Sequence, residues 1–353
     1  MPLKSAHIAL TLLLALLAAL ACVQLNTPLP WMIGPLLATA ALSMLGAPTS
    51  SYTPLRNAGQ WAIGAALGLY FTPQVVSLVA SLWWAIAVNI VGALALGLAF
   101  GAWMHRVHYP PGKFHIAGLT RTTTYFAGPI GAASEMTLLG ERYGAQTDLV
   151  ASAHSLRVLL VTLIIPFGLQ WAELQGLDTT LPGPRLVDWP GFGVLAALTG
   201  VGCWVMLKLE RTNPWFIGAL AVAVLLTANG FILSAIPQWL TNAAQLVIGI
   251  SLGVRFTRQF VHLAPRWLAS VALATVAMIV LCAGFAWLLA IATQQHWTTV
   301  MLGTSPGGIA EMAITAKVLQ LGVPLVTAFH VTRLAAVLLL VEPMYRWMYA
   351  PKT

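Results

Sequence analysis

The chain has 353 residues, of which 59% are hydrophobic and only 7% are charged, and its mean hydropathy is +0.85. Soluble domains carry about 25% charged residues, so this composition excludes a chain whose main solvent is water. The net charge of +8 comes from basic residues that stand singly or in twos and threes near the ends of apolar segments. That distribution is typical of orientation signals in membrane proteins and argues against direct nucleic-acid binding.

Twelve apolar segments follow one another along the chain. In the first half they cover residues 6–24, 29–47, 56–72, 75–104, 115–141 and 147–171. In the second half they cover residues 190–208, 212–230, 240–256, 265–292, 299–319 and 322–347. Uninterrupted apolar runs of about 20 residues cross a bilayer as helices and lack the alternation of a β-barrel. The sequence therefore predicts an all-α polytopic membrane protein.

The two halves repeat the same short motifs in the same order. Pro30–Gly34 (PWMIG) returns as Pro214–Gly218 (PWFIG), and 214 − 30 = 184. Asn57–Gly64 (NAGQWAIG) returns as Asn242–Gly249 (NAAQLVIG), and 242 − 57 = 185. The sequence thus predicts a tandem duplication, with a first membrane repeat at 1–171, a polar linker at 172–189 and a second repeat at 190–353. Residues 6–24 resemble a cleaved leader, but the equivalent residues 191–208 cannot be one, so we expect 6–24 to be the first helix.

The fifth segment of each repeat contains helix-breaking residues. The first copy carries Pro129 and Gly131, and the second carries Pro306, Gly307 and Gly308. Proline removes a backbone donor and glycine weakens a helix by about 1 kcal/mol relative to alanine. Broken backbone is tolerated at membrane depth only where protein or a water-filled cavity surrounds it. We therefore expect a non-helical break in each fifth segment, next to a site.

The basic residues distinguish two topologies. If each fifth segment is broken or re-entrant and returns to its own side, each repeat crosses five times and the two repeats have opposite orientations. The loops with Arg106 and Arg258 and both chain ends then fall on the cytoplasmic side, as the positive-inside rule favours. Full crossing by both fifth segments would place the second-repeat basic loops outside. The inverted arrangement is therefore the prediction.

The paired motifs resemble those of the AbrB family of bacterial inner-membrane proteins. The resemblance covers essentially the whole chain and is most specific at Ser305–Gly308 (SPGG), at Leu156–Leu159 (LRVL) and at Thr332–Leu334 (TRL). The first repeat reads Ala127–Gly131 (AGPIG) instead of the SPGG pattern. The resemblance implies a duplicated membrane module, and members are described either as regulators of gene expression, of the aidB gene among others, or as ammonia monooxygenases. Nothing in the chain is similar to the small soluble DNA-binding regulator that shares the family name.

Paired ionisable residues lie in or beside the broken segments. Glu135 and Glu311 follow the two breaks at equivalent positions. His154 and Arg157 stand three residues apart, as do His330 and Arg333, so each pair shares one helix face. One interpretation pairs each arginine with a carboxylate or backbone carbonyls, and the other has it offer its planar fork to an anionic substrate beside a titrating histidine. The two are compatible, since substrate can displace a resting partner. The candidate substrate- or ion-binding residues are Pro129, Gly131, Glu135, His154, Arg157, Pro306, Gly307, Gly308, Glu311, His330 and Arg333.

Three classes of function compete. Inverted repeats with broken helices are typical of secondary transporters, so a carrier of a small solute, with an anion as one candidate, is the first hypothesis. The alternative is a membrane protein that regulates gene expression, directly or through the solute it handles. An oxygenase needs clustered metal ligands, and the scattered histidines do not suggest one, so we expect no enzyme activity, cofactor or metal. The expected location is the inner membrane, in contact with lipid, with homo-oligomerisation left open.

Overall fold

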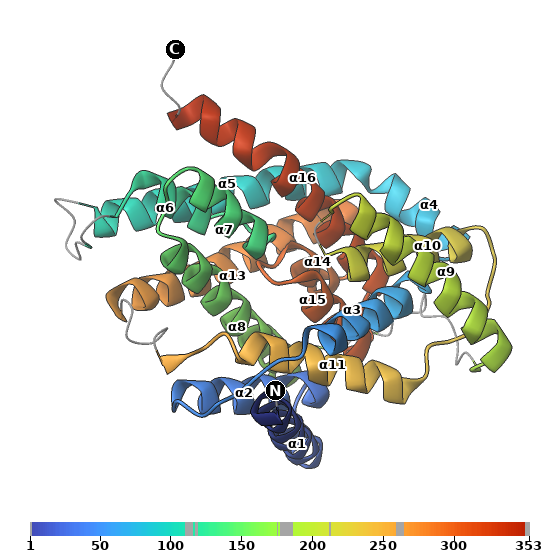
Figure 1. Ribbon diagram of the computed structural model, residues 1–353. Coiled ribbons are helices and arrows are strands. Elements are labelled where there is room, and N and C mark those ends of the chain that lie inside the picture. The colour runs from blue at the N-terminus through green and yellow to red at the C-terminus, as the bar shows by residue number, and fades with distance from the viewer. Residues whose placement is uncertain are drawn as a thin grey trace. The chain divides into compact units, whose positions relative to one another are not determined.

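A computed structural model describes residues 2–109, 116, 119–174, 176, 186–211, 213–258 and 265–349, and the side chains from residue 6 onward. Fifteen helices occupy this described part of the chain (Figure 1), which confirms the all-helical prediction. Six of them are long and apolar enough to cross a membrane. They are α1 (Pro2–Gln24, apolar from Ala6), α5 (Trp83–His108), α8 (Thr147–Trp171), α9 (Trp189–Lys208), α13 (Pro265–Thr293) and α16 (Val323–Tyr349).

The remaining apolar segments form shorter or bent elements. Helices α2 (Pro30–Met44) and α10 (Pro214–Ala228) have 15 residues each, which is about 22 Å at about 1.5 Å per residue and less than a hydrocarbon core. Helices α3 (Thr53–Gly68) and α4 (Pro73–Ser81) form one pair bent by 86°. The ten crossings expected from the sequence therefore stay a prediction.

The apolar segment predicted over 75–104 contains two helices. Helix α4 ends at Ser81 and α5 begins at Trp83, because Leu82 leaves the helical conformation with φ −94° and ψ 17°. No proline or glycine stands at this position, so the sequence gives no local signal for the break.

The chain forms two compact units, and each draws on both halves of the sequence. Unit 1 contains Met1–Ser81, Ile165–Val261 and Ala313–Leu325, and unit 2 contains Leu82–Ile164, His262–Met312 and Val326–Thr353. A compact unit and a sequence repeat are different divisions of a chain. The predicted repeat boundaries are therefore neither confirmed nor contradicted by these units.

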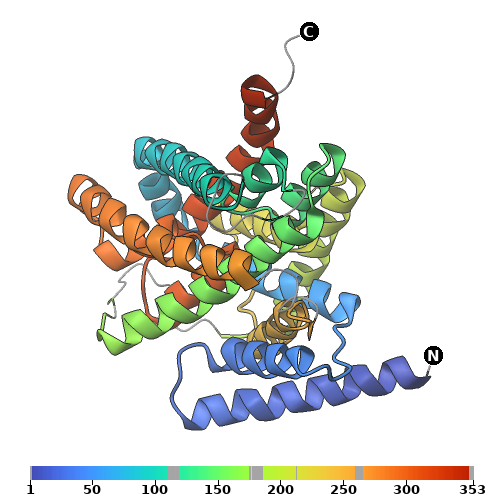
Figure 2. The same cartoon turned by 90° about the vertical axis from the view of Figure 1, so that its left-hand side faces the viewer.

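Unit 1 is a chain of packed helices. Helix α1 packs on α2, α2 on α11 (Gln238–Gly253), α11 on α3, α3 on α10, and α10 on α9. Figure 2 shows α1 and α2, both in blue, side by side. Glycines allow the closest approaches: a methyl group built on Gly64 would lie 2.4 Å from the Phe216 carbonyl oxygen, and one built on Gly249 would lie 2.5 Å from that of Met32. Small residues at such crossings let helix backbones meet in a membrane.

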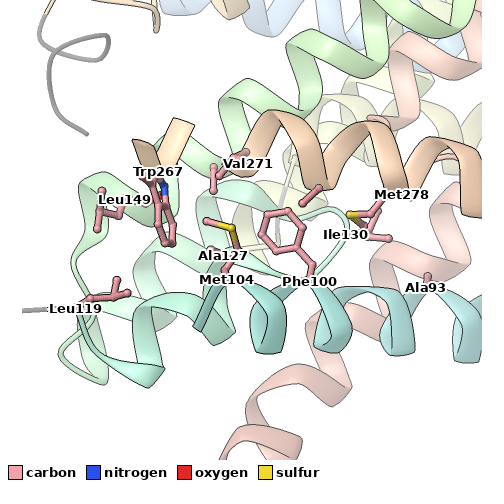
Figure 3. Packing of buried hydrophobic residues seen from close by; sticks show 12 residues of the cluster. Ala93, Phe100, Met104, Leu119, Ala127, Ile130, Leu149, Trp267, Val271 and Met278 are labelled. Atoms are coloured by element: carbon pink, nitrogen blue, oxygen red, sulfur yellow. The ribbon is translucent and has the colours of Figure 1, made fainter. Parts of the chain in front are cut away.

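Unit 2 contains the candidate site. It holds α5, α6 (Arg121–Ala127), α7 (Ala133–Arg142), most of α8, α13, α14 (Trp297–Thr304), the start of α15 (Ile309–Val318) and most of α16. Figure 3 shows the core between α5 and α13, where Met104 lies opposite Trp267 and Ala93 lies opposite Met278. The residue numbers rise in opposite directions along the two helices. Helices α5 and α13 are therefore antiparallel neighbours.

Candidate functional site

Both predicted breaks are present in unit 2. Helix α6 ends at Ala127 and α7 begins at Ala133, while α14 ends at Thr304 and α15 begins at Ile309. In the first break Gly131 has a φ of +108°, and in the second Ser305 is extended with ψ 149° ahead of Pro306. The last carbonyl groups of a helix have no partner within the helix. The C-terminal ends of α6 and α14 therefore present carbonyl oxygens that other groups must satisfy.

Arg157 on α8 satisfies the carbonyls of the first break. Its Nη1 donates to the Gly128 carbonyl at 2.9 Å and its Nη2 to the Pro129 carbonyl at 2.6 Å. The arginine is only 1% exposed. His154, one turn earlier, donates from Nε2 to the Phe126 carbonyl at 2.9 Å and accepts from Arg157 Nη2 at Nδ1, at 2.6 Å. One arginine and one histidine together hold the end of α6.

Arg333 and His330 on α16 repeat this arrangement at the second break. Arg333 donates from Nη1 to the Ser305 carbonyl at 2.6 Å and from Nη2 to the Gly307 carbonyl at 2.9 Å. His330 donates from Nε2 to the Leu302 carbonyl at 2.8 Å and accepts from Arg333 at Nδ1, at 2.8 Å. Of the two sequence-based alternatives for these arginines, the described contacts match the pairing with backbone carbonyls.

The partners fix the protonation of both histidines in this state. A carbonyl oxygen only accepts, so Nε2 carries the proton, and a guanidinium group only donates, so Nδ1 carries the lone pair. Both rings are therefore the neutral Nε2–H tautomer, with both nitrogens occupied. The expectation that these histidines titrate does not fit this arrangement, because a proton on Nδ1 would take the place of the arginine hydrogen bond.

Each break also lies close to the helix that holds the other break: the first break approaches α16, and the second approaches α8. A methyl group built on Gly131 would lie 3.9 Å from Leu334 Cδ1, next to Arg333, and one built on Gly307 would lie 3.0 Å from Val161 Cγ1, one turn after Arg157. The structure thus brings both breaks and both arginines into one region of unit 2.

The two predicted glutamates lie at the start of the helix that follows each break. Glu135 and Glu311 lie in the first turns of α7 and α15. Glu135 is half-buried and Glu311 is 8% exposed. The Glu311 carboxylate covers Gly308, where an added Cβ would lie 2.1 Å from Oε2. Acidic side chains at a helix N-terminus are stabilised by its dipole. That the glutamates and arginines line one polar cavity stays a prediction.

Helix α5 supports the first break through residues that we did not single out in the sequence. A methyl group on Gly128 would lie 2.2 Å from the Gly97 carbonyl oxygen, and one on Gly101 would lie 2.7 Å from that of Thr124. The Phe100 ring lies 5.5 Å from Arg157 Cζ. The Gly97-x-x-x-Gly101 spacing is a helix-packing signal in membranes and could have indicated this contact.

The two ends of the first broken segment lie close to the same part of unit 2. Thr122 near the start of α6 hydrogen-bonds Tyr345 at 2.8 Å, and Tyr143 just after α7 donates to Glu342 at 2.9 Å. Both partners lie near the end of α16. Segment 121–142 therefore begins and ends beside the same end of α16, and whether it re-enters the membrane stays a prediction.

No three histidine, cysteine, aspartate or glutamate side chains within the described residues are grouped as metal ligands. The site consists instead of two helix breaks, each held by a buried arginine–histidine pair. This arrangement defines the class of the protein as a multi-span helical membrane protein with broken helices in its interior.

The chain belongs to the AbrB family. Its residues 31–349 match the family described as "Transition state regulatory protein AbrB". It is 28% identical over 349 residues to the Escherichia coli (strain K12) protein named "Putative regulator AbrB", covering 96% of each chain. It is 25% identical over 346 residues to "Uncharacterized protein YhjN" of Bacillus subtilis (strain 168), covering 90% of this chain and 87% of the relative. No solved structure matches the chain.

Proposed function

We propose that this protein is a secondary carrier of a small anionic solute. The proposal rests on the buried Arg157 and Arg333, whose hydrogen-bond partners are backbone carbonyls and neutral imidazoles. Charged groups inside a membrane are costly and by default functional. Two guanidinium cations in one region of unit 2 favour an anion in their neighbourhood.

The arginine–carbonyl contacts suggest how binding is coupled to movement. An anion that reaches Arg157 or Arg333 competes with carbonyl oxygens for the same N–H donors, and a charged acceptor makes the stronger hydrogen bond. A guanidinium that turns toward the anion releases the end of α6 or α14. Each released half-helix is then free to shift relative to α8 or α16.

We further propose that the carrier consists of two inverted repeats. Some structural features occur twice, at two positions separated by the sequence offset of the predicted duplication, and they support this proposal. The close approach at Gly34, 2.6 Å from the Ala18 carbonyl oxygen, matches the one at Gly218, 2.6 Å from that of Gly202. Leu29 and Asn213, each just before an equivalent helix, share a left-handed conformation with φ of 49° and 48°. The antiparallel run of α5 and α13, which are equivalent in the two repeats, favours inversion.

The distribution of basic residues in unit 2 supports one orientation of this unit in the membrane. The end of α5 meets the start of α13, with His108 and Trp267 rings 5.4 Å apart, and the start of α6 meets the end of α16. This end carries Arg106, Arg121, Arg142, Arg266 and Arg346. The spans 83–104 and 267–293 that lead away from it contain no lysine or arginine. By the positive-inside rule this end is cytoplasmic, and we propose an inner-membrane protein with both termini in the cytoplasm.

The name of the Escherichia coli relative describes a regulator, so regulation is a second candidate function. We propose that any such role in this chain follows from the solute that it carries. That the chain is not an enzyme, and in particular not a monooxygenase, remains an expectation.

The proposal is tested with purified protein in two steps. Thermal unfolding is measured against a panel of small carboxylates, phosphate, sulfate and halides, and each anion that stabilises the protein is used for counterflow in proteoliposomes. We expect stabilisation and uptake to be lost together in an Arg157→Lys/Arg333→Lys double variant and kept in Arg211→Lys, a change at an exposed residue. Equal uptake by the double variant and the unchanged protein would refute an arginine-centred carrier.

A further inference from the structure

Arginines and tyrosines form a second cluster, at the end of unit 2 away from the breaks. We call it the arginine–tyrosine cluster, and its members are Arg121, Arg142, Tyr143, Tyr345, Arg346 and Tyr349. Arg121 Cζ lies 5.3 Å from the Tyr349 ring centroid, and Arg346 donates from Nε to the Tyr143 hydroxyl at 2.8 Å. The Tyr345 ring lies between these two contacts, 5.6 Å from Tyr349 and 4.8 Å from Tyr143. The cluster thus joins α6, α7 and α16 without a residue of either break.

Glu342 holds Arg346 in place and leaves much of it exposed. Its Oε1 accepts from Arg346 Nη2 at 2.5 Å and from Tyr143 at 2.9 Å, and Arg142 lies within its electrostatic range. The Arg346 side chain is nevertheless 64% exposed, and Arg121 and Arg142 are also exposed. Arg142 and Arg346 therefore lie near one carboxylate, which already has two donors, while Arg121 lies beside the Tyr349 ring.

The outer face of α16 sets the depth of this cluster in a bilayer. Leu339 is 70% exposed and Leu340 is 43% exposed, as lipid-facing residues are, and Trp347 farther along is 83% exposed. Tryptophan and tyrosine concentrate at the level of lipid headgroups. Arg346 precedes Trp347 directly, so its guanidinium stands at the depth of the lipid phosphates.

We propose that the arginine–tyrosine cluster binds the headgroup of an anionic phospholipid. A phosphodiester oxygen matches the planar donor fork of arginine, and the Tyr143 hydroxyl, which donates to Glu342 and accepts from Arg346, holds the Arg346 fork in place. The neighbouring apolar face of α16 accommodates the acyl chains, which a soluble anion lacks. This inference does not depend on transport, because no residue of the cluster belongs to the two breaks.

The test measures lipid binding to the delipidated full-length protein by native mass spectrometry. The probes are phosphatidylglycerol and phosphatidylcholine, added in equal amounts. We expect preferential retention of phosphatidylglycerol, and a loss of about fivefold in its binding for each of Arg121→Gln and Arg346→Gln, from about 1 kcal/mol per basic residue at an anionic surface. Arg211→Gln, at the exposed end of α9 in unit 1, is the control and should bind as the unchanged protein does.

Three results would overturn the proposal. They are equal binding of the two lipids, retained preference in an Arg121→Gln/Arg346→Gln variant, and an equal loss in the Arg211→Gln control. Displacement of the lipid by millimolar inorganic phosphate would also count against it, since it would indicate a site for a soluble anion. Thermal unfolding of Arg121→Gln, which leaves the Glu342–Tyr143 contact intact, shows whether a loss of binding reflects misfolding.

Discussion

The imidazole of His108 and the indole of Trp267 lie 5.4 Å apart between ring centroids. His108 is the last residue of α5 and Trp267 stands in the first turn of α13. The end of one helix therefore meets the start of the other inside unit 2. The same two helices occupy equivalent places in the predicted repeats, and equivalent helices that run antiparallel are what an inverted duplication requires.

The contact between His108 and Trp267 predicts that the loops at residues 110 and 260 lie on the same side of the membrane. Reporter fusions at residue 110 and at residue 260 should report the same compartment, the cytoplasm, and so should a fusion at the C-terminus. A fusion within residues 175–187 should report the periplasm. Residues 110 and 260 lie outside the described residues, so the experiment tests the topology independently. Opposite signals at 110 and 260 would contradict the inverted arrangement.

Sequence reasoning located the breaks because proline and glycine act locally. Pro129, Gly131 and Pro306–Gly308 combine proline with glycine within a few residues, and the helices end beside them, whereas the single prolines Pro35 and Pro166 remain inside helices. The end of α4 could not be predicted in this way, since Leu82 is not a helix breaker and its conformation depends on the surrounding fold. The short length of α2 and α10 was missed for a related reason, because hydropathy does not show where an apolar run stops being helical.

The candidate site was predictable in its residues but not in its contacts. The three-residue spacing indicated that His154 and Arg157 share a helix face. It did not indicate which of the possible partners the arginine takes, because the carbonyls of residues 128 and 129 lie 28 or more positions away in sequence. The neutral tautomer of the histidine follows only from those partners. Tertiary structure was needed for both.

Replacing either arginine by lysine should destabilise the protein. Arg157 donates from two separate nitrogen atoms to two carbonyls and an imidazole, and a single ammonium group cannot reproduce that geometry. Loss of one charged hydrogen bond costs about 1.5–3 kcal/mol, so we expect a clearly lower unfolding temperature for Arg157→Lys and for Arg333→Lys. Thermal unfolding in detergent measures this effect, with Arg211→Lys as control. Unchanged unfolding of both variants would contradict the role of the arginines in holding the breaks.

The histidines should tolerate glutamine better than alanine. Glutamine can donate from its amide nitrogen to the Phe126 carbonyl and accept from Arg157 at its amide oxygen, as neutral His154 does. Alanine leaves a buried donor and a buried acceptor without partners, at about 1–3 kcal/mol each. We therefore expect His154→Ala to lower the unfolding temperature more than His154→Gln. Equal effects of the two changes would argue against the assigned tautomer.

Two glycines in unit 1 should not accept even a methyl group. A Cβ on Gly64 or Gly249 would lie 2.4 or 2.5 Å from a backbone oxygen of the adjacent helix, and overpacking of this kind costs about 1–3 kcal/mol. Gly200 on α9 has no atom within 4 Å of an added Cβ, so alanine there should be neutral or stabilising through its helix propensity. Unfolding of Gly64→Ala, Gly249→Ala and Gly200→Ala measures the contrast. Similar behaviour of all three variants would contradict the close helix approach.

The second break should not accept a bulky side chain at Gly307. A Cβ on Gly307 would lie 2.7 Å from Met312 Cγ and 3.0 Å from Val161 Cγ1, so leucine forces the break away from α8 and strains the Gly307 carbonyl contact with Arg333. We expect Gly307→Leu to insert in the membrane and to lose the anion-dependent thermal shift and uptake. Gly284→Leu is the control, because an added Cβ on that exposed α13 glycine has nothing within 4 Å. Anion response in Gly307→Leu equal to that of Gly284→Leu would show that the second break takes no part in solute binding.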